Sequence, residues 1–148
     1  MRHRVCRLIC LLVAACIGGA SLADGFCAAL EEYETSEQGD LSLFDAAGLD
    51  TDPVCGASRA LSGSVSNHCY WAFPYRASQS HLAFDAMVKR VALCADGNAR
   101  ADGDAGVNHP DSYDLRRFTV GGNIVDVSLK DKAALQQTIV FLRVSGAP

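Results

Sequence analysis

The stretch from His68 to Cys94 constrains the fold more than any other part of the chain. It contains the only Trp and two of the four Tyr. Bulky side chains and a cysteine occupy every second position at its start: Cys69, Trp71, Phe73 and Tyr75. This period of two, rich in aromatic residues, predicts a β-strand. Pro74 cannot donate a ladder hydrogen bond, so the strand is expected to end there or to lie at a sheet edge.

A helix is predicted directly after this strand. Its apolar residues follow the spacing i, i+3, i+4, i+7 of one helical face: Phe84, Met87, Val88 and Val91. We expect Ser78 or Ser80 to cap its start and Gly97 to stop its end. Trp71 and Phe73 are then expected to pack against this helix in the core, which is the usual place for large aromatic side chains.

Residues 1–23 have the pattern of a secretory signal peptide. Three arginines precede the apolar run 8–17, and small residues stand at Ser21 and Ala23. The run is shorter than the roughly 20 apolar residues that a membrane-spanning helix needs. We therefore predict cleavage after Ala23 and export to the periplasm or the exterior.

A second way of processing stays open. Val13-Ala14-Ala15-Cys16 resembles a bacterial lipobox. In that case residues 1–15 would form a lipoprotein signal, and Cys16 would be the lipidated first residue of a membrane-anchored protein. In both cases residues 24–148 are expected to form a single exported domain.

Four cysteines remain after residue 23, and an exported domain with four cysteines is expected to contain two disulfides. Three pairings are possible. We expect Cys27–Cys55 and Cys69–Cys94, because each pair closes a loop of roughly 25 to 30 residues, worth on the order of 3 kcal/mol in the chain-entropy model.

Acidic residues are concentrated at the start of the predicted mature chain. Residues 24–52 contain nine Asp and Glu and no Lys or Arg, whereas 53–148 contain eight acids and ten bases. Residues 24–148 thus carry 17 acids against ten bases, a net charge of −7. This balance disfavours nucleic acid as a partner, because phosphate contact needs a basic surface. We predict that 24–52 is an acidic cover of the domain; the alternative is a docking strip for a basic partner.

The remaining pattern completes an α+β domain. Further elements are predicted as a short helix at 26–33 and strands at 115–120, 124–129 and 138–144. Gly121-Gly122-Asn123 is typical of a hairpin turn. The predicted fold is a small, disulfide-stapled α+β domain with one main helix packed on an antiparallel sheet of about four strands.

One candidate for catalysis combines two histidines. His68 adjoins the aromatic strand, and His109 lies close in sequence to Asp111. If the strand and the loop meet, Asp111 could orient a histidine general base, with Ser66 or Ser112 as nucleophile. No Gly-x-Ser-x-Gly elbow supports this small-hydrolase hypothesis, and the polar loop residues are also ordinary turn formers.

The loop 96–108 is a candidate calcium site. Its possible oxygen ligands are Asp96, Asn98, Asp102 and Asp104. Calcium prefers six to eight oxygen ligands, but the order required in an EF-hand is not met here. A calcium-stabilised envelope domain is therefore a third hypothesis. The chain contains no phosphate loop, dinucleotide fingerprint or metalloprotease helix, and we expect no cofactor.

Partner binding is the hypothesis that the sequence favours over catalysis. The expected contact residues are aromatic or basic: Tyr70, Arg76, Arg116 and Arg117. Lys130 and Lys132 are expected to extend the two hairpin arginines into a basic patch. The alternative is that this patch pairs with the acidic cover 24–52 of the same chain. The predicted function is that of an exported binding, accessory or inhibitor-like protein. Its partner would be another envelope or secreted protein, bound through the sheet surface or the loop 96–113.

Overall fold

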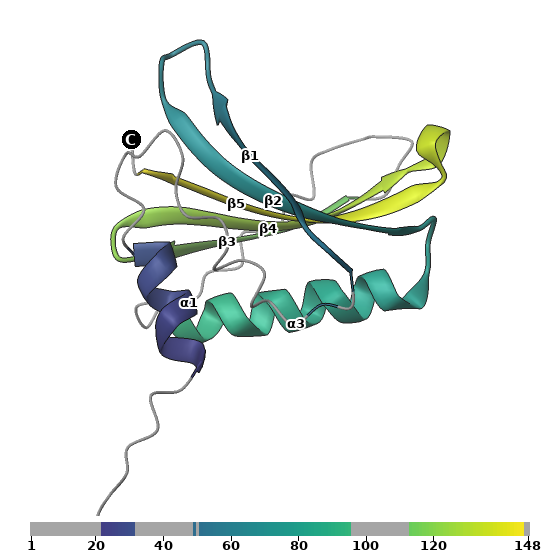
Figure 1. The fold of residues 1–148 in the computed structure, drawn as a ribbon, viewed down its shortest axis with the longest axis horizontal. Coiled ribbons are helices and arrows are strands. Elements are labelled where there is room, and N and C mark those ends of the chain that lie inside the picture. The colour runs from purple at the N-terminus through teal and green to yellow at the C-terminus, as the bar shows by residue number, and fades with distance from the viewer. Residues whose placement is uncertain (1–21, 32–48, 50, 96–112, 147–148) are drawn as a thin grey trace, which may run out of the picture.

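The computed structural model describes residues 22–31, 49, 51–95 and 113–146, and these form two layers (Figure 1). The elements in chain order are α1 (Leu22–Glu31), β1 (Val54–Arg59), β2 (Val65–Pro74), α3 (Ser78–Cys94), β3 (Tyr113–Val120), β4 (Asn123–Lys132), the 3₁₀ turn η1 (Ala133–Leu135) and β5 (Gln137–Gly146). The strands form one antiparallel sheet in the order β1-β2-β5-β4-β3, with α3 along one face. The α+β class is confirmed, with five strands in the sheet.

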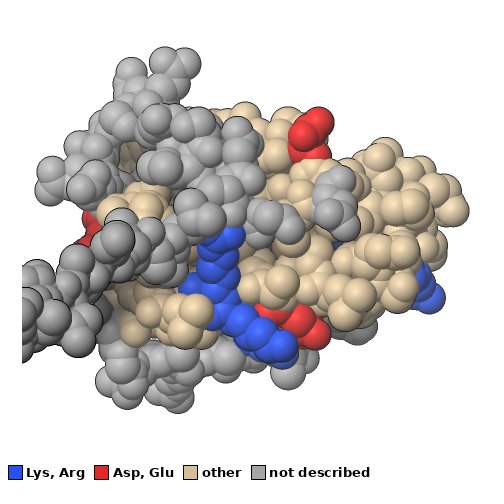
Figure 2. All heavy atoms as spheres, turned by 60° about the horizontal axis from the view of Figure 1, so that its bottom comes forward, with Lys and Arg blue, Asp and Glu red and all other residues tan. Residues whose placement is uncertain are grey.

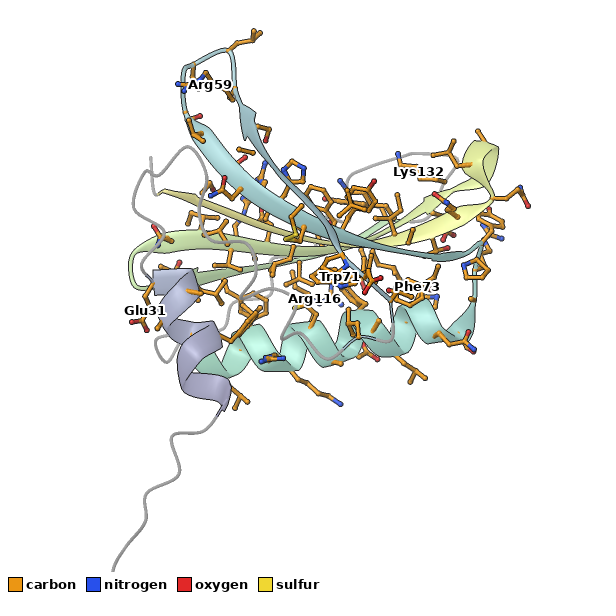
Figure 3. The ribbon with its side chains drawn as sticks, in the orientation of Figure 1. Glu31, Arg59, Trp71, Phe73, Arg116 and Lys132 are labelled. Carbon is orange, nitrogen blue, oxygen red and sulfur yellow. A yellow bond between two sulfur atoms is a disulfide. The ribbon has the colours of Figure 1, made fainter. Side chains whose placement is uncertain are left out.

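The alternation predicted for the aromatic strand is confirmed in β2. Cys69, Trp71 and Phe73 are buried, and the residues between them are partly exposed. Figure 3 shows Trp71 and Phe73 pointing from the sheet into the layer shared with α3. There they join the apolar face of the helix and the inner residues of the other strands: Phe84, Met87, Val91, Val125, Val127, Leu129, Val140, Leu142 and Val144.

The main helix is where the periodicity predicts it, but its ends differ from the expectation. The N-cap residue is Ala77, which makes no side-chain capping bond. Ser80 donates its hydroxyl hydrogen back to the Ala77 carbonyl at 2.7 Å, so neither predicted serine caps the helix. The helix ends at Cys94, and Gly97 lies outside the described residues.

The predicted disulfide pairing is wrong. Cys55 is joined to Cys69 and Cys27 to Cys94. Residues 54–59, which the sequence did not indicate as a strand, form β1 and place Cys55 directly opposite Cys69. Loop length alone could not anticipate this, because it ignores strand register and the packing of α1 on α3.

The N-terminal helix α1 packs at one end of the domain, on the same side of the sheet as α3 (Figure 1). It buries Phe26 and Leu30 completely or nearly so. Asn123, the first residue of β4, donates its side-chain amide to the carbonyls of Leu30 at 2.9 Å and Glu31 at 3.0 Å. The helix begins two residues before the predicted cleavage point and ends before the predicted residue 33.

Candidate functional site

The face of the sheet that points away from α3 is the candidate site, because no described helix packs on it. We call it the open face. Its larger side chains are His68, Tyr70, Tyr113, Arg117, Asp126, Lys130, Lys132, Phe141 and Arg143. Figure 2 shows the opposite side of the molecule, that of α3, where several basic and acidic side chains lie among uncharged residues. Charge and aromatic rings therefore meet on the open face.

A row of charged residues crosses this face. Arg117, Asp126 and Arg143 lie opposite one another on β3, β4 and β5, and His68 on β2 lies opposite Arg143 at the end of this row. Asp126 accepts hydrogen bonds from both guanidinium groups, including one of 2.7 Å from Arg117 Nε. Burial alone would raise the pKa of Asp126, but the bonds from Arg117 and Arg143 outweigh it and hold the pKa below its usual value.

His68 stacks on Phe141, with ring centroids 5.1 Å apart and an interplanar angle of 17°. Burial, and secondly the charge of Arg143, lower the pKa of His68 below its ordinary 6.5. The neutral form of the imidazole therefore predominates at pH 7. It acts with Phe141 as a flat, largely apolar surface beside the charged row.

The side-chain ammonium group of Lys130 lies between two aromatic rings. Its Nζ lies 5.3 Å from the centroid of the Tyr113 ring and 5.1 Å from that of Phe141. Among the described residues no carboxylate forms an ion pair with it. Burial lowers the pKa of Lys130, and the charges of Lys132 and Arg143 lower it further against the opposing effect of Asp126.

The two adjacent arginines of the predicted basic patch point to opposite faces. Arg117 lies on the open face, whereas Arg116 lies in the layer beside α3 (Figure 3). Arg116 pairs with Asp114, and its guanidinium carbon lies 5.8 Å from the centroid of the Phe84 ring. The structure thus places Arg117, but not Arg116, on the same face of the sheet as Lys130.

Arg76 is placed by a partly buried hydrogen-bond network. Its φ of 55° lies in the left-handed region, and its backbone N–H donates to Thr138 Oγ1 at 2.8 Å. Its Nε donates to Asp131 at 3.0 Å, and Asp131 also accepts the Thr138 hydroxyl at 2.6 Å. Arg76 thereby ties the turn after β2 to strands β4 and β5, away from the open-face row.

Tyr70 lies on the open face, opposite Phe141 on β5 and Val54 on β1. Of the proposed hydrolase set, His68 and Ser66 are described, and Ser66 Oγ lies 2.9 Å from Ser58 Oγ. His109, Asp111 and Ser112 lie outside the described residues, as do Asp96, Asn98, Asp102 and Asp104 of the candidate calcium loop. Within the described ranges, no three His, Cys, Asp or Glu side chains are grouped as metal ligands.

The hairpin of β1 and β2 is a feature that the sequence analysis missed. Its end projects away from α3 (Figures 1 and 3), and the fully exposed Leu61 lies in its turn. The turn is held by the Ala60 N–H donating to the Ser64 carbonyl at 2.8 Å and by Arg59 Nη1 donating to the Gly63 carbonyl at 3.1 Å. With the disulfide between Cys55 and Cys69 behind it, the hairpin is well fixed.

A hollow lies between the start of α3 and the end of β2. It has a volume of about 460 Å³. Its lining is mainly apolar: Leu49, Thr51, Phe73, Pro74, Gln79, Leu82, Ala83 and Ala86. None of the described residues that line this hollow is charged, so it is a less distinctive surface than the open face.

No family model and no curated protein matches this chain. Among solved structures, CalU16 from Micromonospora echinospora is similar at 14% identity, over 67% of this chain and 70% of CalU16, with a TM-score of 0.32. A likeness at this level carries no inference about activity. No helix in the described part of the chain is both long and apolar enough to cross a membrane.

Proposed function

We propose that the protein is a small exported binding protein that contacts a partner protein through the open face of its sheet. The observation that carries this proposal is the placement of Lys130 between Tyr113 and Phe141, beside the charged row, on a face that no described helix covers. Aromatic and arginine side chains are the residues most enriched at the centres of protein interfaces.

The rigidity of the scaffold supports a role in binding. The face is built on hydrogen-bonded strands, and both disulfides lie in the same domain. Side chains presented by rigid strands lose less conformational entropy on association than those of a flexible loop. The disulfides also agree with export, because such bonds persist in oxidising compartments.

Site-specific photo-crosslinking tests this proposal. A photoreactive residue at Thr119, exposed on β3 and on the open face, is compared with one at Leu93, exposed on α3. Both proteins are expressed in cells that export the natural chain. A specific protein adduct is expected from position 119 and not from position 93. Absence of an adduct at 119, or equal adducts at both positions, contradicts the proposed contact face.

A further inference from the structure

We infer that the partner segment bound by the open face is an acidic, extended peptide segment whose carboxylates pair with Lys130 and Lys132. This inference rests on the proposed function and names the chemistry of its partner. The Lys130 site is defined as Lys130 and Lys132 on β4, the flanking rings of Tyr113 and Phe141, and Arg143 on β5.

The open face has an excess of positive charge among the described residues. It carries four cations and a single carboxylate, that of Asp126, which is shared between Arg117 and Arg143. This leaves three positive charges in excess. Lys130 and Lys132 make no ion pair with any described carboxylate, so the face is complementary to an anionic partner.

The surroundings of Lys130 make it the centre of this site. The rings of Tyr113 and Phe141 attract the ammonium group by cation–π interaction, but they supply no countercharge. The ammonium group is partly desolvated, with Lys132 and Arg143 near it. A carboxylate that approaches here gains more from pairing than it would with a fully hydrated lysine, because the local dielectric is lower.

The spacing of the two lysines indicates the form of the partner. Lys130 and Lys132 are alternate residues of β4 and lie on the same face, roughly 6.8 Å apart along the strand. An extended peptide repeats its side chains on one face at this same interval. Two acidic residues separated by one residue can therefore pair with both lysines while the rings pack against the peptide.

A polymeric anion matches these observations less well. Residues 24–148 have a net charge of −7, which at long range repels a highly charged polyanion more strongly than a short acidic segment. Nucleic-acid binding also depends on many simultaneous phosphate contacts. The cations of the open face are few and lie close together. Such a small group suits a short acidic segment better than a long polyanion.

A peptide-binding experiment on the full-length, oxidised protein tests the inference. The probe is a fluorescent peptide of alternating Glu and Thr, and the matched peptide has Gln in place of Glu. At low salt the Glu peptide is expected to bind about tenfold more tightly than the Gln peptide. Lys130→Gln and Lys132→Gln are each expected to weaken this binding severalfold. Lys89→Gln, which removes an exposed charge from α3, is the control and leaves it unchanged.

Three outcomes overturn the inference. The first is equal binding of the Glu and Gln peptides, and the second is an equal loss of affinity in Lys89→Gln and Lys130→Gln. The third is binding of heparin or oligo-dT that depends on Lys130 and is tighter than that of the peptide, which assigns the site to a polyanion. If the adduct from position 119 persists in a Lys130→Gln, Lys132→Gln protein, the proposed contact face stands and only the acidic partner is wrong.

Discussion

Cys27 of α1 is bonded to Cys94, the last residue of α3, across 67 residues of sequence. The other disulfide joins Cys55 and Cys69, which are 14 residues apart and face each other in one hairpin. The two bonds therefore differ in kind. One fixes the first helix to the core, and the other reinforces contacts that the strands already make.

Removal of the two disulfides is expected to have unequal effects. In the chain-entropy model the longer loop is worth about 4.4 kcal/mol and the shorter about 3 kcal/mol. The double variant Cys27→Ala, Cys94→Ala should therefore lose more unfolding free energy than Cys55→Ala, Cys69→Ala. Urea denaturation of the two purified proteins measures this difference. A hairpin variant that is the less stable of the two would contradict the expectation.

Two neighbouring glycines provide a matched test of how α1 docks. Gly121 and Gly122 have φ of +54° and +85°, which alanine adopts at a cost of about 1 to 2 kcal/mol. A Cβ on Gly121 would also lie 2.8 Å from Glu31 Cγ and 3.1 Å from its Cα, whereas one on Gly122 meets nothing within 4 Å. Gly121→Ala should thus lower the free energy of unfolding, measured in urea, by about 1 kcal/mol or more beyond the loss in Gly122→Ala. Equal losses would mean that α1 does not press on this turn.

The sequence predicted those helices and strands in which large apolar side chains recur at a regular interval. The aromatic alternation of β2 and the apolar stripe of α3 were recognised because large side chains there must all face the core. Strand β1 was missed because its Cys-Gly-Ala-Ser stretch is mostly exposed and has little strand propensity. Its formation depends on pairing with β2, which a local pattern does not contain.

The candidate site was predicted in part. Tyr70 and Arg117 do lie on the open face, but Arg116 does not, and strict alternation along 115–120 could have separated the two arginines. The sandwich of Lys130 between Tyr113 and Phe141 combines residues from three strands. It could not be predicted without the order of the sheet, which places β5 between β2 and β4.

The buried Thr138 hydroxyl is expected to matter for stability. It donates to Asp131 at 2.6 Å and accepts the Arg76 N–H at 2.8 Å, and Thr138 is fully buried. Thr138→Val leaves Asp131 and the Arg76 N–H without this hydroxyl. The free energy of unfolding is expected to fall by about 2 kcal/mol. Thr119→Val, at an exposed position of β3, is the control and should change stability by less than about 0.5 kcal/mol. Similar midpoints for the two variants in urea would argue against the network.

The mature N-terminus distinguishes the two predicted export routes. Ordinary cleavage after Ala23 yields a soluble chain that begins at Asp24. Lipoprotein processing would instead yield Cys16 with attached acyl chains and a membrane-bound protein. Intact mass and N-terminal sequencing of the exported protein are expected to give Asp24. A retained precursor in the cytoplasm would contradict both routes.

The histidine on the open face is expected to make stability depend on pH. Burial, followed by the charge of Arg143, lowers the pKa of His68 in the folded protein below the 6.5 of an unperturbed histidine. The unfolded chain therefore binds a proton at His68 more readily than the folded protein does. The contribution of neutral His68 to the free energy of unfolding is fully present above pH 6.5. It is lost as the pH falls from 6.5 towards the lowered pKa.

The comparison of His68→Gln with the natural protein isolates the pH-dependent contribution of His68 to stability. The urea midpoint of the natural protein should fall more steeply between about pH 7 and pH 5 than that of His68→Gln. His81→Gln removes an exposed imidazole from α3 and is expected to keep the steeper dependence. The lowered pKa of Asp126 acts in a more acid range, because its unperturbed value is 3.8. Parallel pH curves for His68→Gln and the natural protein would show that protonation of the imidazole near Arg143 does not destabilise the folded protein.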